Sequence, residues 1–323
     1  MIRVGIVGGT GYTAGELIRI LINHPDVEIV SITSTSSAGK PIYETHRELI
    51  GETELLFSEK LAPCDVIFLC LGHGISREFL TNNPIEDSCK VIDLGNDFRL
   101  DGTFGERSFT YGLTDLNKEA IQKSDNVANP GCFATAIQLA LLPLVKEGLI
   151  SDEIHIHAIT GSTGAGKSLT GTSHFSYRDN NSSVYKCFTH QHLGEIRKTL
   201  SAMNGSEIPE ISFVPMRGDF PRGIFASLYT ECSIEDAEKV ANLYKEYYND
   251  SPFVHYSDKG ISLKEVINTN KCLIHTELHN GKIHITSIID NLIKGASGQA
   301  VENMNLMFGL DQKRGLSLKP STF

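Results

Sequence analysis

The chain has 323 residues, of which 40% are hydrophobic and 21% charged, values typical of about two globular domains with ordinary buried cores. Its 29 basic and 39 acidic residues give a formal net charge of −10. This balance argues against a general nucleic-acid or anionic-membrane binder, because phosphate-rich surfaces attract an excess of Lys and Arg. No stretch approaches the roughly 18 apolar residues of a membrane helix, and no signal-peptide pattern opens the chain. We therefore expect a soluble cytoplasmic protein.

The seven cysteines are widely spaced and never form a C-x-x-C pair. An odd number with this spacing argues against a disulfide framework or a zinc ribbon and favours a reducing compartment. We expect no metal site.

The first ninety or so residues alternate between strand and helix patterns. Near-continuous runs of Val, Ile and Leu predict strands at 3–7, 27–32, 66–71 and 90–94, and a broad apolar face predicts a helix at 16–23. Strands of this kind, separated by helices, indicate an α/β domain whose parallel sheet is covered on both faces.

The pattern changes after about residue 150. Polar and apolar residues alternate at 153–159 and 282–288, and further strands are predicted at 224–231 and 272–278. Half-polar strands indicate a sheet with one solvated or interface face, in a second domain of α+β type. A helix is predicted at 295–308, packed back on the first domain.

A glycine-rich turn follows the first strand. Residues 8–14 read GGTGYTA and contain G-x-G-x-x-A between a strand and a helix. The glycines permit a tight turn and let backbone N–H groups approach a pyrophosphate at the helix N-terminus. We interpret the turn as a dinucleotide site, although an ordinary strand-to-helix turn would show the same glycines.

The end of the second predicted strand bears on the cofactor. An NAD site normally carries an acidic residue there for the ribose, whereas residues 33–40 read TSTSSAGK. Ser34, Ser36 and Lys40 suit a 2′-phosphate, which favours NADP(H) over NAD(H). The alternative is a serine-rich loop without a role in binding.

Residues 161–168, GSTGAGKS, match the P-loop pattern G-x-x-x-x-G-K-S. A P-loop needs a helix that starts at its Lys-Ser, but Thr and Gly residues, which are poor helix formers, follow here. We expect a glycine-rich loop near a cofactor and treat a kinase or NTPase as the less favoured alternative.

The motif NPGC at 129–132 precedes an apolar helix predicted at 134–146. Cys132 is thereby expected at or beside the helix N-terminus, where the macrodipole and free N–H groups stabilise a thiolate and could hold an oxyanion. Free cysteines are usually small buried hydrophobic residues, but this setting favours a nucleophile.

His190 and His192 flank Gln191 just before a predicted helix start. A histidine is the usual acid/base partner of a cysteine; the alternative is a pair of structural histidines. Arg99, after the fourth strand, and Arg222 could each hold a phosphate through two hydrogen bonds, although surface salt bridges are the commoner role.

Together these motifs resemble those of the N-acetyl-γ-glutamyl-phosphate reductases, the arginine-biosynthesis members of the aspartate-semialdehyde dehydrogenase-like family. The resemblance covers essentially the whole chain, and its five motifs occur in the same order. They are GGTGYTAGE at 8–16, NPGC at 129–132, HQH at 190–192 followed by Glu195, the stretch from 215 to Gly223, and DNLIKGASGQA at 290–300.

The resemblance implies a fold of two domains and a set of site residues. An NADP-binding Rossmann domain would comprise 1–131 and be completed by a C-terminal helix within 291–323, and 132–290 would form a catalytic and dimerisation domain of a homodimer or homotetramer. Cys132 would be the nucleophile, His192 or His190 the acid/base, and Glu195 would orient the substrate or the imidazole. The remaining implied contacts are Gly8, Thr10, Gly11, Tyr12 and Thr13 to the pyrophosphate, Ser34 and Ser36 to the 2′-phosphate, Ser162, Gly164 and Asn291 on the nicotinamide side, and Arg99, Asn129 and Arg222 to the substrate.

The implied reaction is the NADPH-dependent reduction of an N-acylglutamyl phosphate to its semialdehyde through a cysteine thioester. Gln191 and Gly194 stand where many relatives carry Arg and Pro, so an N-succinyl substrate is an alternative to N-acetyl. Two less favoured interpretations are a semialdehyde dehydrogenase for an aspartyl or aminoadipyl phosphate and a dinucleotide-binding redox sensor without turnover.

Overall fold

The computed structural model describes residues 1–234 and 236–322, which form two compact units. One unit comprises Met1–Pro130 and Ala296–Ser317, and the other comprises Gly131–Gly295 with the residues from Leu318 onward. The sequence analysis placed the divisions after residues 131 and 290.

The first unit is built on a six-stranded sheet in the order β2-β1-β3-β4-β8-β7, and every neighbouring pair is parallel. Its strands are β1 (Ile2–Val7), β2 (Val27–Thr33), β3 (Val66–Leu69), β4 (Lys90–Asp93), β7 (Thr110–Tyr111) and β8 (Asn126–Ala128). The central strand β3 is buried at every position, as a strand covered on both faces requires. The predicted parallel sheet is confirmed; a short hairpin, β5 (Thr103–Phe104) and β6 (Arg107–Ser108), was not foreseen.

The described residues of this unit form four α-helices, α1 (Tyr12–Leu21), α2 (Ser76–Asn82), α3 (Thr114–Gln122) and α8 (Gly298–Met307), and the short 3₁₀ helices Ile42–Glu44 and Arg47–Leu49. Helix α1 begins four residues before the predicted start, directly after Gly11. Helix α8 contacts α1, α3 and β4, which confirms that it packs on this unit. A π-helical turn, Ile293–Ser297, precedes α8, and Gly309 with φ of +69° follows it. The helix is therefore shorter than the predicted span of 295–308.

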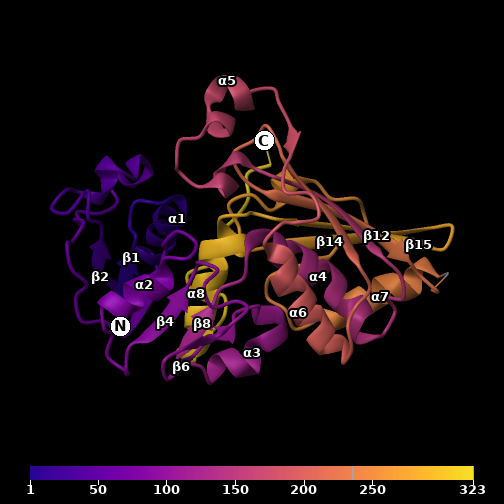
Figure 1. Cartoon of the computed structure of the whole chain (residues 1–323), viewed down its shortest axis with the longest axis horizontal. Coiled ribbons are helices and arrows are strands. Elements are labelled where there is room, and N and C mark those ends of the chain that lie inside the picture. Colours follow the sequence, from indigo (N-terminus) through magenta and orange to yellow (C-terminus); the bar gives the residue numbers. More distant parts are fainter. Residues whose placement is uncertain (235, 323) are drawn as a thin grey trace. The chain divides into compact units, whose positions relative to one another are not determined.

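The second unit contains a mixed seven-stranded sheet in the order β10-β11-β9-β12-β15-β14-β13. The strands are β9 (Ile154–Thr160), β10 (Ser183–Val184), β11 (Ile211–Arg217), β12 (Ile224–Glu231), β13 (Val254–Tyr256), β14 (Cys272–His279) and β15 (Lys282–Ile289). Burial alternates along β9 and β12, because one face of the sheet packs on helices. Helix α4 (Cys132–Lys146) contacts β12 and β15, α6 (His192–Asn204) contacts α4, and α7 (Ala237–Tyr247) contacts β13 and β14 (Figure 1).

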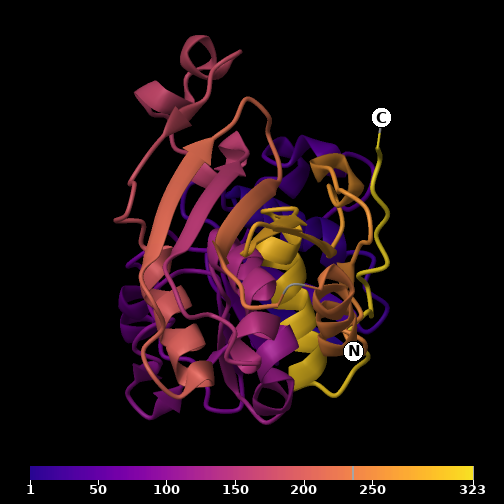
Figure 2. The ribbon, with the colours of Figure 1, turned by 90° about the vertical axis from the view of Figure 1, so that its right-hand side faces the viewer.

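The P-loop match does not form a P-loop. Residues Ser162–Ala165 make a 3₁₀ turn, and no helix begins at Lys167 or Ser168. This confirms the expectation from the sequence. The following segment, which carries the short helix α5 (Phe175–Arg178), projects beyond the end of the sheet in Figure 1 and Figure 2.

Two kinds of feature are absent from the part of the chain that the structure describes. None of its helices is both long and apolar enough to cross a membrane. In the same residues, no group of three or more His, Cys, Asp and Glu side chains is placed to hold a metal ion.

Candidate active site

Cys132 is the first residue of α4, after Gly131 as N-cap. The first helical hydrogen bond runs from the Thr135 amide to the Gly131 carbonyl at 2.8 Å, so the amides of the first turn have no backbone acceptor within the helix. The Cys132 thiol thus lies where the helix dipole favours a negative charge. A Cβ on Gly295 would lie 2.8 Å from Cβ of Cys132, so residue 295 must be small.

Glu195 connects this helix start to α6. Its Oε2 accepts a hydrogen bond from the Gly131 amide at 3.1 Å, and its Oε1 lies 3.9 Å from Nε2 of His192. Glu195 is 3% exposed and His192 5%. A Cβ on Gly131 would lie 2.4 Å from His192 Nε2 and 2.7 Å from Glu195 Oε1. The glycine before Cys132 therefore lets the imidazole and the carboxylate reach the backbone beside the thiol.

His190 supports His192. Its Nδ1 accepts a hydrogen bond from the His192 amide at 3.2 Å, so a neutral His190 carries its proton on Nε2. The two rings meet edge to face with centroids 4.6 Å apart, and His190 also contacts Phe133, the residue after the cysteine. These contacts bring both predicted histidines to the start of α4, with His192 next to Gly131.

Tyr185 and Arg217 were not singled out by the sequence analysis. The Tyr185 ring contacts His190 edge to face at 5.7 Å, and the Arg217 guanidinium lies 4.8 Å from the centre of the Tyr185 ring. Burial, with a smaller effect of neighbouring Cys132, raises the pKa of Tyr185, so its hydroxyl stays protonated. Arg217 is paired with no carboxylate among the described residues. The motif at 215–223 contains Arg217, but the sequence analysis gave this residue no role; in the structure it pairs with Ser183 of β10 and with Thr160 of β9.

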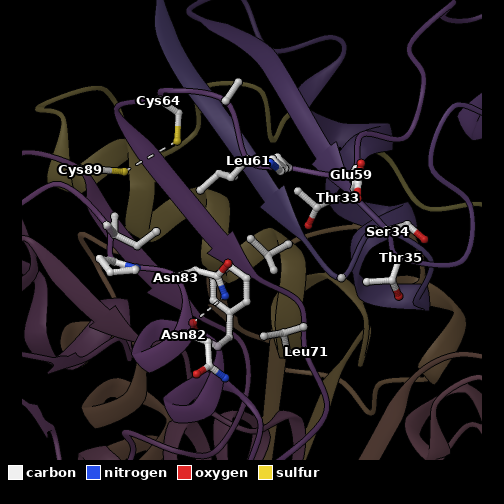
Figure 3. Close-up of a pocket in the computed structure, with 18 of the residues that line it drawn as sticks. Thr33, Ser34, Thr35, Glu59, Leu61, Cys64, Leu71, Asn82, Asn83 and Cys89 are labelled. Carbon is white, nitrogen blue, oxygen red and sulfur yellow. Dashed lines mark hydrogen bonds between the residues drawn. The ribbon is translucent and has the colours of Figure 1, made fainter.

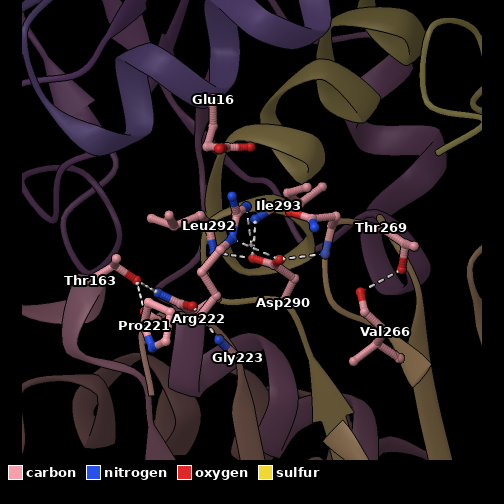
Figure 4. A network of polar contacts seen from close by, with 12 residues as sticks. Glu16, Thr163, Pro221, Arg222, Gly223, Val266, Thr269, Asp290, Leu292 and Ile293 are labelled. Atoms are coloured by element: carbon pink, nitrogen blue, oxygen red, sulfur yellow. Dashed lines mark hydrogen bonds and ion pairs between the residues drawn. The ribbon is translucent and has the colours of Figure 1, made fainter. Parts of the chain in front are cut away.

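Arg222 is held by a buried carboxylate. Its Nε and Nη2 donate to Oδ2 and Oδ1 of Asp290 at 3.1 and 3.3 Å. Asp290 is fully buried and also accepts from the backbone amides of Asn268 and Leu292 at 2.8 Å. Figure 4 shows the hydrogen bonds that converge on this carboxylate. The charge of Arg222 is therefore already opposed within the second unit.

Asn291 holds the glycine-rich loop in place. Its Oδ1 accepts from the Gly223 amide at 2.6 Å and its Nδ2 donates to Oγ1 of Thr163 at 3.0 Å. Ser162 and Gly164 lie on the same 3₁₀ turn. The three residues predicted on the nicotinamide side therefore lie close together. Both polar atoms of the Asn291 side-chain amide are hydrogen-bonded to Gly223 and Thr163.

A separate cavity of about 750 Å³ lies in the first unit. The loops after β1 and β2 line it, through Gly8, Gly9, Thr10, Ser34 and Ser36 among others. Figure 3 labels Thr33, Ser34 and Thr35 of the β2 end in the cavity wall. The sequence analysis assigned both segments to one dinucleotide site, from the glycine-rich turn after the first strand and from the serine-rich end of the second.

The residues around this cavity fit a dinucleotide. Gly8 has φ of +82°, and a Cβ there would lie 2.6 Å from the carbonyl oxygen of Cys70. A Cβ on Gly11, the N-cap of α1, would meet nothing within 4 Å. Open space at the amides of a helix N-terminus is what a pyrophosphate requires. Tyr12 and Thr13 form the first turn of α1, where Thr13 also accepts a hydrogen bond from Ser297 through its carbonyl at 2.7 Å.

The structure adds three charged residues to this cavity, Glu59, Lys60 and Glu86. Ser34 Oγ accepts from the Ser37 amide at 3.2 Å and lies 3.5 Å from Ser36 Oγ. Glu59 and Lys60 line the same cavity because residue 58 bridges Thr33 at the end of β2. The sequence analysis missed this carboxylate, which lies 26 residues beyond the strand end and shows no local signal.

Arg99 and Asn129 lie inside the first unit. Arg99 is 6% exposed and donates to the carbonyls of Asn129 and Leu94 at 2.8 and 3.2 Å. The Asn129 side chain donates to the Ala296 carbonyl at 3.1 Å and accepts from Asn303 at 3.0 Å. Both predicted substrate residues thus also have structural contacts, and their contact with a substrate stays a prediction.

Two family models match the chain. Residues 3–124 match the NAD binding domain of semialdehyde dehydrogenase, and residues 132–291 match its dimerisation domain. Similar curated proteins, each covered over its full length by the full chain, are the N-acetyl-gamma-glutamyl-phosphate reductases of Flavobacterium johnsoniae and Phocaeicola vulgatus, which are 55% and 54% identical.

Solved structures with a similar fold are aspartate semialdehyde dehydrogenases. The enzyme II of Vibrio cholerae, complexed with ASA, has a TM-score of 0.71 at 15% identity, over 96% of this chain and 98% of that one. The Candida albicans enzyme with NADP has a TM-score of 0.69 at 15% identity, over 95% and 99%. At this identity the similarity shows the fold.

Proposed function

The chain belongs to the semialdehyde dehydrogenase family, and on that premise we propose that it reduces N-acetyl-L-glutamyl 5-phosphate to the 5-semialdehyde in arginine biosynthesis. The names of its similar relatives support the substrate. The observation that carries the chemistry is the position of Cys132 at the N-terminus of α4, beside His192 and Glu195.

In the proposed reaction the Cys132 thiolate attacks the acyl carbon, the C–O bond to phosphate breaks, and phosphate leaves with that electron pair. The thioester so formed keeps the acyl group on the enzyme. The backbone amides of the first turn of α4 and the helix dipole stabilise the oxyanion of the addition step. NADPH, when bound, would supply the hydride for reduction of the thioester carbonyl; Gly8, Thr10 and Ser34 are among the residues that would hold it.

His192 then acts as acid and base for one proton of the hemithioacetal. Reduction gives a hemithioacetal oxyanion on Cys132, and collapse of this group releases the aldehyde and restores the thiolate. His192, with Glu195 3.9 Å from its Nε2, gives and takes back the proton of the oxyanion. Glu195 holds the imidazole and the Gly131 backbone in one arrangement, so it is a positioning residue.

An anionic substrate needs a cation near the thiol. Arg222 already faces Asp290, whereas Arg217 lies over Tyr185 next to the histidines. We assign Arg217 to an anionic group of the substrate, and Arg99 and Asn129 remain the proposed phosphate-side residues. Arg222 then acts mainly by fixing the Gly223 loop.

The proposed cofactor is NADP(H). Residues of the β1 and β2 loops line the cavity, and the hydroxyls of Ser34 and Ser36 together with Lys60 suit a 2′-phosphate. Lys40, which the sequence analysis named for this phosphate, is exposed and is not one of the lining residues. Glu59 lines the same cavity and would suit the free ribose hydroxyl of NAD(H). Steady-state kinetics with both cofactors test this proposal, and a higher kcat/KM with NADH would overturn it.

One assay separates the candidate substrates. We expect phosphate-dependent reduction of NADP by N-acetyl-glutamate 5-semialdehyde, measured beside the N-succinyl compound and aspartate semialdehyde. A preference for N-succinyl would change the acyl group alone, and a preference for aspartate semialdehyde would contradict the proposal. We also propose a homodimer or homotetramer formed through residues 132–291, which light scattering after gel filtration tests.

A further inference from the structure

Two cysteines outside the acyl-transfer site lie side by side in the wall of the first unit's cavity. The Sγ atoms of Cys64 and Cys89 are 3.8 Å apart, and both residues line the cavity (Figure 3). The fold places them there because Cys64 precedes β3 and Cys89 precedes the adjacent parallel strand β4, with Val66 opposite Lys90. The Lys90 amide also donates to the Asp65 carbonyl at 2.9 Å.

We propose that Cys64 and Cys89 are an oxidation site, at which a hydroperoxide converts the two thiols to a disulfide that alters the cofactor cavity. A disulfide bond is about 2.05 Å long, so one sulfur must move toward the other from 3.8 Å. Cys64 lies on a segment without helix or strand structure before β3, so this segment can supply the movement.

The two sulfurs differ in a way that sets the order of the chemistry. Cys64 is partly exposed and Cys89 is 5% exposed. The interaction between the two sulfurs lowers the pKa of Cys64, and the same interaction together with burial raises the pKa of Cys89. Cys64 is therefore the sulfur that reacts as a thiolate, and Cys89 is the resolving thiol.

The step balances with the hydroperoxide as the oxidant. The Cys64 thiolate attacks one peroxide oxygen, the O–O bond breaks, and the departing oxygen takes a proton and leaves as an alcohol or as water. The resulting sulfenic acid is attacked by the Cys89 sulfur, which gives the S–S bond and releases the hydroxyl group with the Cys89 proton as water. Two thiols lose two electrons, and the peroxide gains them.

Cys64 and Cys89 differ from the other cysteines of the chain in that both line the cavity; Cys187 is partly exposed but is not one of the lining residues. Burial raises the pKa of the Cys70 thiol to about 12, which makes it unreactive. Cys232 and Cys272 are also buried. Cys132 is the proposed acyl-transfer nucleophile, so loss of activity in peroxide would not by itself report on Cys64 and Cys89.

The experiment therefore uses the Cys132→Ser protein and reads the disulfide directly. After limited hydrogen peroxide and alkylation of the remaining thiols, peptide mass spectrometry should find a Cys64–Cys89 cross-link that dithiothreitol removes. Cys64→Ser cannot form the cross-link, and its Cys89 should be oxidised at least about tenfold more slowly than the thiols of the parent protein. Cys89→Ser should stop at a sulfenic acid on Cys64 that dimedone traps. Cys232→Ser is the matched control and should behave as the parent protein.

Cofactor measurements on the same samples test the link to the cavity. NADPH fluorescence titration should give an affinity lowered several-fold in the oxidised protein and restored by dithiothreitol, and bound NADP should slow the oxidation. A cross-link between other cysteines, no cross-link at all, or equal oxidation of Cys64→Ser would overturn the assignment. Unchanged NADPH affinity of a fully cross-linked sample would contradict the effect on the cavity. Because Cys132 is absent throughout, these outcomes do not depend on the acyl-transfer mechanism.

Discussion

One carboxylate, that of Glu195, contacts both His192 and the backbone that precedes Cys132. Its two oxygens lie 3.9 Å from His192 Nε2 and 3.1 Å from the Gly131 nitrogen. With Glu195 3% exposed, water cannot replace these contacts without rearrangement of α6. This relationship joins the start of α4 to the start of α6 and defines the arrangement that the next two predictions test.

Glu195→Gln should preserve the fold and reduce kcat by about 10- to 100-fold, because a neutral amide supports a cationic imidazole less well than a carboxylate does. Glu210→Gln, which breaks an exposed pair with Arg197, is the control and should leave kcat unchanged. Steady-state kinetics of both variants, with thermal unfolding as a check on folding, make the comparison. Equal kcat values for the two variants would remove Glu195 from the mechanism.

Gly131→Ala tests the close approach of the imidazole. The new Cβ would lie 2.4 Å from His192 Nε2, so the ring must move away, and we expect kcat to fall by about 100-fold or more. Gly260→Ala, where a Cβ would meet nothing within 4 Å, should keep full activity. A Gly131→Ala enzyme with normal kcat would mean that this contact does not position the histidine.

Arg217→Gln should raise the KM of the acyl phosphate substrate by about 10- to 100-fold, with a smaller effect on kcat, because a guanidinium that binds an anion is worth roughly 1.5–3 kcal/mol. Arg197→Gln, at a surface ion pair on α6, is the matched control. Initial rates at varied substrate and saturating NADPH separate the two constants. If only kcat fell in Arg217→Gln, the arginine would act through Tyr185 and not on the substrate.

Asp93, at the end of β4, should make stability depend on pH. Burial raises the pKa of this carboxyl from 3.8 to about 6, and its Oδ2 has no hydrogen-bond partner among the described residues. Between these two values the folded protein binds more protons than the unfolded chain does, so the free energy of unfolding falls as the pH rises. Above about pH 6 Asp93 is ionised in the folded protein as well, and the stability that its protonated form contributed is lost.

Asp93→Asn removes this titration. The free energy of unfolding of the variant minus that of the wild type should be about 1.4 kcal/mol larger at pH 7.5 than at pH 5. The difference between the two pH values is the useful quantity, because every effect of the amide that does not depend on pH cancels in it. Urea unfolding of both proteins at the two pH values measures it; parallel pH dependence would mean that Asp93 is ionised in the fold throughout this range.

The sheet of the first unit was predictable because buried parallel strands are continuous apolar runs. Residues 66–69 and 90–93 show this pattern plainly, and both strands are present. The two-residue strands β5, β6 and β7 are too short to carry a period, so no sequence pattern marks them. The π-helical turn before α8 could not be predicted from the sequence either, because its residues fit an α-helical pattern equally well.

The candidate site divides in the same way. Gly131, Cys132, His190 and His192 stand in motifs whose chemistry depends on local position, and the sequence analysis proposed the cysteine and both histidines for one site. The structure brings them close together, and their roles in the reaction stay a prediction. Arg217 enters only through the pairing of β11 with β10 and the aromatic contact to Tyr185. Such contacts arise from tertiary packing, which sequence periodicity and turn signals do not predict.

The central claim is that the acyl group resides on Cys132 during turnover. Wild-type protein should be mixed with N-acetyl-glutamyl phosphate without NADPH, quenched in acid, digested and measured by mass spectrometry. The account predicts an N-acetylglutamyl adduct on the peptide that contains Cys132, which is lost on addition of NADPH and absent in Cys132→Ser. An adduct on another cysteine such as Cys187, or near-normal turnover of Cys132→Ser, would contradict it.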